Sequence, residues 1–338
     1  MLSWLYLFSA ILFTRAVEWH YFGDHGTSHW YEDYPICSKD RQSPIDFPQV
    51  EDMHYDSQLV PFRFTGFDDV SSYGLTLVNN GHTAVIKVTS GELFVEGGGL
   101  PGRFRTAQFH FHWGRSNSGG SEHTLNGRRY PLELHIVNYN EKYGDLSNAA
   151  SKERDGLAVL GFWFEVATKD NDALLPLIEQ LSHVKTHGSS VVLSGVNLGQ
   201  LLPIHDDYIE SHYFRYSGSL TTPPCFQSVI WTVFHHPVPI SEQQLQMFRA
   251  LHEDQQPDSE HYLINNFRPV QPLNGRVISR NFQPQSKDTT VDTPSVTTTK
   301  PKRDLKINFR MLKLCAQRLR LQLEKEFTFF DKFNIHHI

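Results

Sequence analysis

Residues 108–113 alternate polar and aromatic side chains, within a predicted strand at 106–113. Successive side chains of a β-strand point to opposite faces, so His110 and His112 share one face of a strand here. The aromatic residues between them occupy the other face. The pattern predicts a strand whose aromatic face packs into a core and whose polar face, carrying Gln108 and both histidines, lines a cavity.

A second segment, residues 132–137 of a predicted strand at 132–139, alternates in the same way, and Glu133 and His135 share a face. If the two strands are neighbours, His110, His112 and His135 converge on one point. Three neutral imidazole nitrogens with an open fourth position are the ligand set of a catalytic zinc ion. The alternative is that each histidine is an ordinary packing or surface residue.

The polar neighbours of these histidines favour the metal site. Gln108 lies two residues before His110, and Glu133 lies two residues before His135, each on the face of its histidine. A metal-bound imidazole needs a partner for its second ring nitrogen, which sets the tautomer and the ring orientation. A carboxylate buried in a sheet without such a partner would be costly.

The hydrophobic pattern predicts few helices and many strands elsewhere. The predicted strands are 75–78, 83–89, 93–96, 157–166 and 229–234, and the almost wholly apolar run 157–164 indicates a strand buried on both faces. The helices are predicted at 172–181 and 241–251, where Ser241 and Gln244 form a capping box. A mixed domain dominated by one large sheet follows.

Composition separates a long body from a tail. The chain has 338 residues, enough for one large or two ordinary domains, and its body shows no linker-like break up to about Phe282. Residues 285–302 are rich in Thr and poor in large apolar side chains, so we interpret 283–304 as a flexible linker. Residues 305–338 form a basic tail. Its residues Leu312, Cys315, Leu319 and Leu323 recur at helical spacing.

Charge and the N-terminus restrict the location and the partners. With 31 basic and 37 acidic side chains the formal charge is −6, which provides no basic face for nucleic acid. An apolar run at 5–13 ends near the small residues Thr14 and Ala16, which predicts a signal peptide over 1–16 and a secreted protein. A buried N-terminal strand is the alternative. Nothing after this run is apolar and long enough to span a bilayer.

Several ordered motifs resemble the α-class carbonic anhydrases. They are the segments 108–114, 120–124, 133–135 and 219–224, joined by 42–45 and 79–82, and the resemblance extends from about Trp19 to Phe282. It implies one large, twisted, mostly antiparallel sheet with a few short helices, a mixed α/β fold. It also implies one Zn²⁺ ion, held by His110, His112 and His135, and reversible hydration of CO2 to bicarbonate through attack by zinc-bound hydroxide.

The same resemblance assigns residues around the metal. Thr221 orients the hydroxide, with Glu122 accepting the hydroxyl proton of Thr221, and Thr222 contacts bicarbonate. The backbone of Asn266 anchors His112. The hydrophobic pocket for CO2 comprises Val137, Val159, Leu220 and Trp231.

Proton removal is assigned to His82, since a relay with a pKa near 7 suits the transfer of a proton to buffer. Tyr21 and Asn80 match the family's residues that order the intervening waters. Outside the family, each of these residues would be read as ordinary surface or core. A role in pH homeostasis follows from the reaction.

Three cysteines fit an oxidising compartment. In secreted members of the resembled family, cysteines at the positions of Cys37 and Cys225 form a disulfide, which would stabilise the fold by about 2–4 kcal/mol. Cys315 is left over in the tail. The tail is compatible with membrane-surface contact, with a dimer linked through Cys315, or with a solvated extension.

Two other functions compete with the enzyme. Some domains of the resembled family have lost zinc histidines and serve as binding or adhesion modules, but all three histidines, together with Glu122 and Thr221, are present here. A metallohydrolase of esters or peptides is the second alternative, and the chain has no H-E-x-x-H helix to support it.

Overall fold

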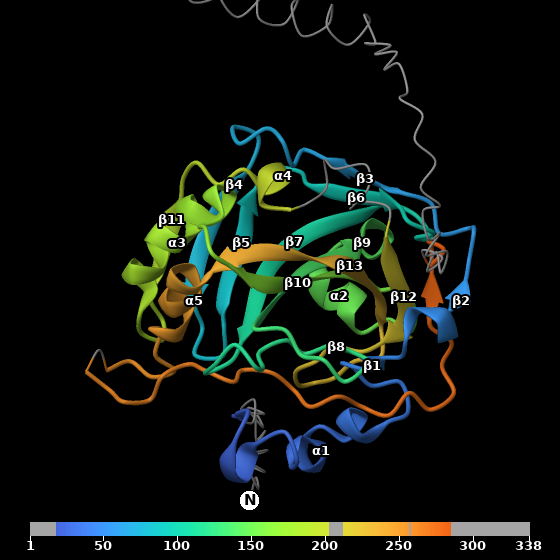
Figure 1. Ribbon diagram of the computed structural model, residues 1–338, viewed down its shortest axis with the longest axis horizontal. Helices are drawn as coiled ribbons and strands as arrows, with labels where there is room; N and C mark the ends of the chain where they lie inside the picture. Colours follow the sequence, from blue (N-terminus) through green and yellow to red (C-terminus); the bar gives the residue numbers. More distant parts are fainter. Residues whose placement is uncertain (1–17, 203–211, 257, 285–338) are drawn as a thin grey trace, which may run out of the picture. The chain divides into compact units, whose positions relative to one another are not determined.

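The computed structural model describes residues 18–202, 212–256 and 258–284 (Figure 1). The strands are β1 (Asp46–Phe47), β2 (His54–Tyr55), β3 (Phe62–Thr65), β4 (Gly74–Asn79), β5 (Ala84–Ser90), β6 (Phe94–Gly97), β7 (Phe104–Trp113), β8 (Thr124–Leu125), β9 (Leu132–Asn140), β10 (Leu157–Ala167), β11 (Ser190–Leu193), β12 (Tyr213–Gly218), β13 (Val229–Ser241) and β14 (Ser279–Arg280).

Twelve of these strands form one sheet in the order β11-β4-β5-β7-β9-β10-β13-β12-β14-β2, with β3 and β6 attached beside β7. Most neighbours are antiparallel. The pairs β10–β13 and β14–β2 are parallel, as is the separate two-stranded ribbon of β1 and β8. The predicted fold, a large and mostly antiparallel sheet with few short helices, is confirmed.

Side-chain alternation places a core on each face of the central strands. The larger core takes the aromatic face of β7 together with Leu134 and Ile136 of β9. The second core takes residues of opposite parity, among them Val137, Val159 and Trp231. Every residue of β9 except Tyr139 is buried, because this strand has cores on both sides. The predicted division of β7 into a core face and a cavity face is confirmed.

The described part of the chain has five short α-helices: α1 (Trp30–Asp33), α2 (Leu146–Ala150), α3 (Leu175–Leu181), α4 (Leu198–Leu201) and α5 (Glu242–Arg249). Six single turns of 3-10 helix accompany them: η1 (Gly23–His25), η2 (Pro35–Ser38), η3 (Val50–Asp52), η4 (Glu141–Tyr143), η5 (Asp172–Leu174) and η6 (Ser182–Val184). None of the described helices is long and apolar enough to cross a membrane.

The predicted elements are largely present. All seven predicted strands occur, and the capping box of Ser241 and Gln244 begins α5 as predicted. The helix predicted over 172–181 divides into η5 and α3. Strand β13 continues seven residues beyond the predicted end at Phe234, through two prolines that normally argue against a strand. The signal peptide and the tail with Cys315 lie outside the described residues.

Candidate active site

The pairing of β7 with β9 sets the three predicted zinc histidines side by side. His110 lies directly opposite His135, and His112 lies opposite Glu133. An irregularity in β7 between Thr106 and Gln108 shifts the register by one residue before the histidines. Without this bulge His110 would face the partner of opposite parity, and its ring would point away from that of His135.

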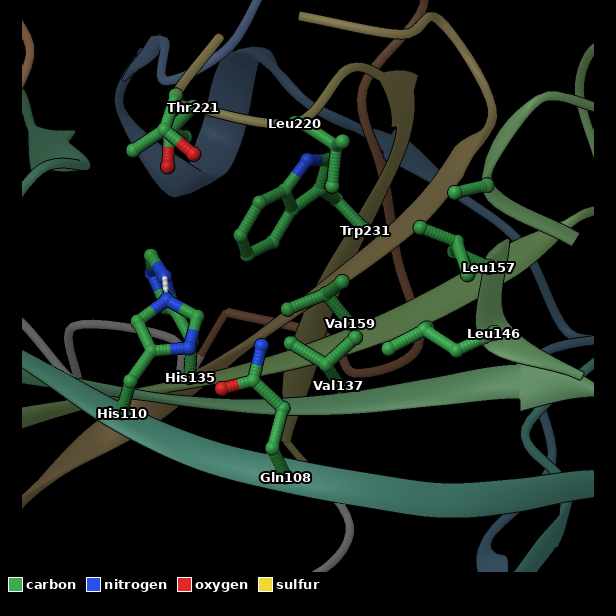
Figure 2. Close-up of a pocket in the computed structure, with 12 residues that line it drawn as sticks. Gln108, His110, His135, Val137, Leu146, Leu157, Val159, Leu220, Thr221 and Trp231 are labelled. Atoms are coloured by element: carbon green, nitrogen blue, oxygen red, sulfur yellow. Dashed lines mark hydrogen bonds between the residues drawn. The ribbon is translucent and has the colours of Figure 1, made fainter. Parts of the chain in front are cut away.

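Three ring nitrogens meet at the centre of this arrangement. His112 Nε2 lies 3.1 Å from His135 Nδ1, which in turn lies 3.3 Å from His110 Nε2. Figure 2 shows His110 and His135 converging at one end of the cavity. A tetrahedral zinc ion with Zn–N bonds of about 2.0–2.1 Å separates its ligand nitrogens by about 3.4 Å. The spacing of these rings therefore fits that metal without rearrangement.

The opposite nitrogens of two rings are committed as donors. His112 Nδ1 donates to the backbone carbonyl of Asn266 at 2.7 Å, and His135 Nε2 donates to Glu133 Oε1 at 2.7 Å. The protons of the neutral rings are thus on the outer nitrogens. The inner nitrogens face each other as lone pairs, and a cation between them makes this arrangement favourable.

Burial favours the neutral form of His110 and His112. Only 1% of the surface of His112 and of His135 is exposed. Burial, followed by the neighbouring histidines, lowers the pKa of His110 well below its usual value. Burial also lowers the pKa of His112, although Glu122 opposes it. Neutral imidazole is the form that coordinates metal.

Glu133 is the centre of the polar network behind His135. Its Oε2 accepts the backbone N–H groups of Glu122 and His123, each at 2.9 Å, and its Oε1 also contacts His123 Nδ1 at 2.7 Å. Burial alone raises the pKa of Glu133, but the contacts with His123 and His135 outweigh it and lower the pKa far below the usual range. Glu133 therefore acts as a fixed anionic acceptor.

His123 is a site residue that the sequence reasoning missed. It is buried, and its Nε2 lies 2.7 Å from the hydroxyl of Tyr216, which donates to Ser43 Oγ. His123 thus couples Glu133 to the strand β12. Its position directly after Glu122 in the segment 120–124 was the available signal.

The predicted hydrogen bond from Thr221 to Glu122 is not formed among the described residues. Glu122 Oε1 instead accepts the backbone N–H of Arg268 at 2.8 Å, and its buried Oε2 has no hydrogen-bond partner there. That oxygen lies 3.4 Å from His112 Nε2. An unpartnered carboxylate oxygen facing nitrogen lone pairs is a second indication that a cation or a further donor belongs at this point.

An apolar cavity of about 200 Å³ opens beside the histidines. In Figure 2, Val137, Val159 and Trp231 line it on the side away from His110. Thr221, Thr222 and Leu220 also line it, so the predicted pocket residues are brought together. Leu146, Ala150 and Leu157 complete it and were not predicted, because their sequence pattern does not distinguish a cavity lining from ordinary core.

Gln108 lines the same cavity from β7, on the face of His110. Within the described part of the chain its side chain makes no hydrogen bond to His110, so its predicted role as the outer partner of that ring stays a prediction. The amide points into the cavity between the histidines and Val137 (Figure 2).

His82 lies outside this cavity, in a neighbouring one of about 120 Å³ that it shares with Tyr21 and Asn266. Its ring stacks on Trp19 with centroids 3.9 Å apart. Burial, followed by His20 and His187, lowers the pKa of His82 to about 4. In this position of the ring the pKa lies below the value near 7 that suits a proton relay, because burial removes the imidazole from water, and the role of His82 in proton transfer stays a prediction.

Tyr21 and Asn80 occupy different environments. Tyr21 is buried beside Trp19 and Trp30, and burial raises its pKa well above the usual value. Asn80 is exposed, and its side-chain oxygen accepts the backbone N–H groups of His82 and Thr83. Asn80 thus shapes the turn that carries His82. It lines neither of the two cavities described here.

The disulfide between Cys37 and Cys225 is present, as the resemblance implied. Cys225 follows the loop that carries Thr221, and its carbonyl accepts from Gln42 Nε2 at 3.2 Å. The guanidinium of Arg268 donates to Gln42 Oε1 and to the carbonyl of Cys37, both at 2.8 Å. The disulfide and this buried cation together hold the N-terminal segment against the loop of Thr221.

Comparisons with known proteins agree with this site. The family model described as "Eukaryotic-type carbonic anhydrase" matches residues 25–282. The chain is 40% identical to carbonic anhydrase 7 of Homo sapiens over 268 residues, 78% of this chain and 97% of that relative. It is 39% identical to carbonic anhydrase 12 of Homo sapiens over 269 residues, 78% of this chain and 73% of the relative. Carbonic anhydrase 3 of Sus scrofa is 35% identical over 270 residues, 79% of this chain and its own whole length.

The matched residues contain all three histidines, the partners of His112 and His135, and the cavity beside them. The predicted zinc ligands and the predicted enzyme class are confirmed. This chain belongs to the eukaryotic-type, or α-class, carbonic anhydrase family and carries that family's zinc-binding histidine triad intact.

Proposed function

We propose that the protein catalyses the reversible hydration of CO2 to bicarbonate and a proton. The observation that carries this proposal is the convergence of three inner ring nitrogens, with two outer protons committed to Asn266 and Glu133, at the end of an apolar cavity. His110, His112 and His135 would hold zinc. The bound ion supplies a Lewis acid that makes a water molecule nucleophilic at neutral pH.

Uncharged ligands suit this chemistry. Neutral imidazoles leave the full positive charge on the metal, whereas a carboxylate ligand would reduce it. Glu133 nevertheless touches His135 through a hydrogen bond, and so holds the ring orientation without entering the ligand set.

Thr221 is proposed to orient the nucleophile, and Glu122 to accept the hydroxyl proton of Thr221. A hydroxyl that donates to a carboxylate presents only lone pairs on its other side, and it then selects ligands that bring a proton. The support is the buried Oε2 of Glu122, which has no partner among the described residues and retains its capacity to accept. Thr222, on the rim of the same cavity, is proposed to contact bicarbonate.

The apolar wall is proposed to receive CO2. The substrate has no net dipole and gains little from hydrogen-bond donors, so a dry surface of the right size is what it requires. Val137 and Val159 are opposite one another in the pairing of β9 with β10, and Trp231 is opposite Val159 on β13. Their small and flat side chains leave the space beside His135.

His82 is proposed to transfer the proton from the site to buffer, with Tyr21 and Asn80 in the supporting water network. In its stacked position the ring is neutral at physiological pH because of its pKa of about 4, and so it can accept a proton but binds it weakly. The cavity shared with Tyr21 and Asn266 gives the ring room to leave Trp19. Away from the stack, renewed hydration would raise its pKa toward the ordinary value.

We also propose that the protein is secreted, with a signal peptide at 1–16, a catalytic domain at 19–282, a linker at 283–304 and a basic tail at 305–338. The disulfide between Cys37 and Cys225 supports an oxidising compartment. Expression in cultured cells, followed by N-terminal sequencing of protein in the medium, tests this. Retention in the cell with an uncleaved N-terminus would contradict it.

Stopped-flow CO2 hydration by the purified protein tests the reaction, with a zinc chelator and with zinc returned afterwards. We expect one catalytic zinc, loss of activity on its removal and recovery on its return. His135→Ala should reduce hydration by at least about a thousandfold, since the nucleophile depends on the metal. A folded protein that binds no zinc and hydrates no CO2 would instead indicate a binding or adhesion module.

A further inference from the structure

A second group of three histidines lies outside the catalytic centre. His212, His235 and His236 each offer a ring nitrogen within 4.8 Å of the other two. They line a cavity of about 240 Å³ together with Glu51 and Phe282. His235 follows Trp231 of the catalytic cavity by four residues of β13, about 13 Å along a strand. The two histidine groups share no residue.

An irregularity of β13 brings two consecutive histidines to one side. Phe162 of β10 pairs with Phe234, but Phe164 pairs with Val238, so β13 has two extra residues in this interval. His235 and His236 lie within it. Consecutive side chains of a regular strand point to opposite faces, and a bulge removes this restriction. The rings of His235 and His236 are accordingly only 4.8 Å apart, centroid to centroid.

The neighbouring strand adds the third ring. His212 directly precedes β12, and its carbonyl accepts the backbone N–H of His235 at 3.0 Å. This backbone contact fixes the two segments against each other. His212 Nδ1 then lies 3.2 Å from His236 Nε2, close to the 3.3 Å separation found between two of the catalytic ligands.

Phe282 supports the cluster from the segment after β14. Its ring stacks on His212 with centroids 4.4 Å apart and lies 5.1 Å from the ring of His235. His212 and His235 therefore pack against the apolar ring of Phe282, and all three histidines are only partly exposed. The Nδ1 atom of His235 is buried and has no hydrogen-bond partner among the described residues.

Two of the three rings are shifted toward the neutral form, which is the form that binds metal. Burial, followed by His236 and His212, lowers the pKa of His235 to about 4. Burial and His236 also lower the pKa of His212. One ring nitrogen of each of the three histidines lies within 4.8 Å of the other two. Imidazole is a preferred ligand of zinc, copper and nickel ions, whereas calcium and magnesium require oxygen.

We propose that His212, His235 and His236 form a second site for a divalent transition-metal ion of the zinc and copper class. Glu51 lines the same cavity. The ion would join the start of β12 to the bulge of β13. The role proposed for this ion is to cross-link the two segments, not to hydrate CO2.

Metal titration of the tag-free, full-length protein tests the proposal after the catalytic site has been loaded with zinc. Zn²⁺ is added against a chromophoric indicator, and we expect one further equivalent to bind to the wild type. His236→Gln should weaken that binding by at least about tenfold, since it removes a direct ligand. His183→Gln, which changes an exposed histidine in η6, is the matched control and should leave the second equivalent unchanged.

Cu²⁺ provides an independent readout on the same zinc-loaded protein. Electron paramagnetic resonance should show hyperfine structure from several nitrogens in the wild type and in His183→Gln. It should show fewer nitrogens in His236→Gln. Metal binding should also raise the unfolding temperature of the wild type more than that of the variant, because only the former gains a bridge between strands.

Two results would overturn the proposal. One is the absence of a further equivalent in the wild type, and the other is undiminished binding after His236→Gln and after His212→Gln, which would place the ion elsewhere. The His212 variant is included because it changes a residue outside the strand and does not depend on the bulge folding normally. Two controls verify that each variant is folded. One is CO2 hydration by the zinc-loaded protein, and the other is the unfolding temperature measured in the presence of chelator.

Discussion

The polar and apolar walls of the catalytic cavity are parts of the same strands, yet different forces hold them. On the polar wall, His135 is hydrogen-bonded to Glu133, and Glu133 is in turn held by two backbone N–H groups. On the apolar wall, Val137 and Val159 face each other without any directional contact. One wall is specified by hydrogen-bond geometry and the other by volume.

This difference determines what each wall tolerates. A buried polar group without its partner costs about 1–3 kcal/mol, so a substitution on the polar wall disturbs a chain of neighbours. A change of volume on the apolar wall acts locally, and its effect depends on whether the substrate still fits. Variants of the two walls should therefore fail in different ways, one through the metal and the other through the substrate.

Val159→Phe is the sharpest test of the apolar wall. The larger ring should fill the space beside His135 and exclude CO2, so that kcat/KM for hydration falls by at least about a hundredfold. Zinc content should not change. Stopped-flow hydration and metal analysis on the same sample measure the two effects separately.

Val159→Ala is the matched control, because it enlarges the cavity instead of filling it. It should retain activity to within about tenfold, at a cost of about 1–3 kcal/mol in the free energy of unfolding. Near-normal hydration by Val159→Phe would show that CO2 does not occupy this wall. Loss of zinc from that variant would show that the two walls are not independent.

Glu133→Gln tests the polar wall. The amide cannot accept from both histidines and both backbone N–H groups as the carboxylate does, so the ring of His135 loses its fixed orientation. We expect zinc affinity to fall by about 10–100-fold, as measured by competition with a chelator. Hydration should fall with zinc occupancy at low metal concentration and recover partly in excess zinc.

Glu165→Gln serves as the control for this variant, since it removes an exposed carboxylate of β10 that pairs with Arg128. It should leave zinc affinity unchanged. Equal affinity in the two variants would contradict the assignment of Glu133 as the residue that orients His135.

The difference between the polar and the apolar wall also explains how much of the site could be predicted from the sequence. His110, His112, His135 and Glu133 were accessible because charged and polar residues on the inner face of a strand require partners, and the period of two places them together. Leu146 and Leu157 were not, because an apolar side chain beside a cavity has the same sequence signature as one in a filled core. The strands that carry the histidines were predicted through this alternation, and the strand at 157–166 was predicted from its almost unbroken apolar run.

What the sequence could not supply was the arrangement across long separations. The bulge before Gln108 and the longer irregularity at His235 and His236 follow from strand pairing, which no local pattern encodes. The stacking of His82 on Trp19 joins residues 63 positions apart, and its effect on the pKa was invisible from either segment. The environment of His82 is therefore visible only in the folded structure, and its role in proton transfer stays a prediction.

His82→Ala tests the proposed route by which the proton leaves the polar wall for the buffer. Without this imidazole the proton must reach buffer directly, and kcat for hydration should fall by about one to two orders of magnitude in weak buffer. Zinc content and KM should change little. High concentrations of imidazole in the medium should restore kcat, which a merely structural defect would not allow.

His183→Gln is the control for this measurement, because that histidine is exposed and distant in sequence from either wall. Unchanged kcat in His82→Ala would indicate that protons leave by another route. A loss that imidazole does not restore would instead indicate damage to the turn formed by Asn80 and His82.

Trp19→Ala should produce the smallest effect and the most specific one. Removal of the stacked indole hydrates His82, so its pKa should rise from about 4 toward the ordinary 6.5. Titration of the ring protons by NMR, in the wild type and in the variant, measures this directly. Phe22→Ala removes an exposed aromatic residue nearby and should leave the pKa of His82 unchanged.

The sign of the accompanying stability change follows from linkage. Since the pKa of His82 is lower in the folded protein than in the unfolded chain, its neutral form contributes stability that is fully present above about pH 6.5 and is lost as the pH falls toward 4. Trp19→Ala should flatten this part of the pH dependence of the unfolding temperature relative to Phe22→Ala. If the pKa of His82 stays near 4 without Trp19, then the neighbouring residues His20 and His187 cause the low pKa instead.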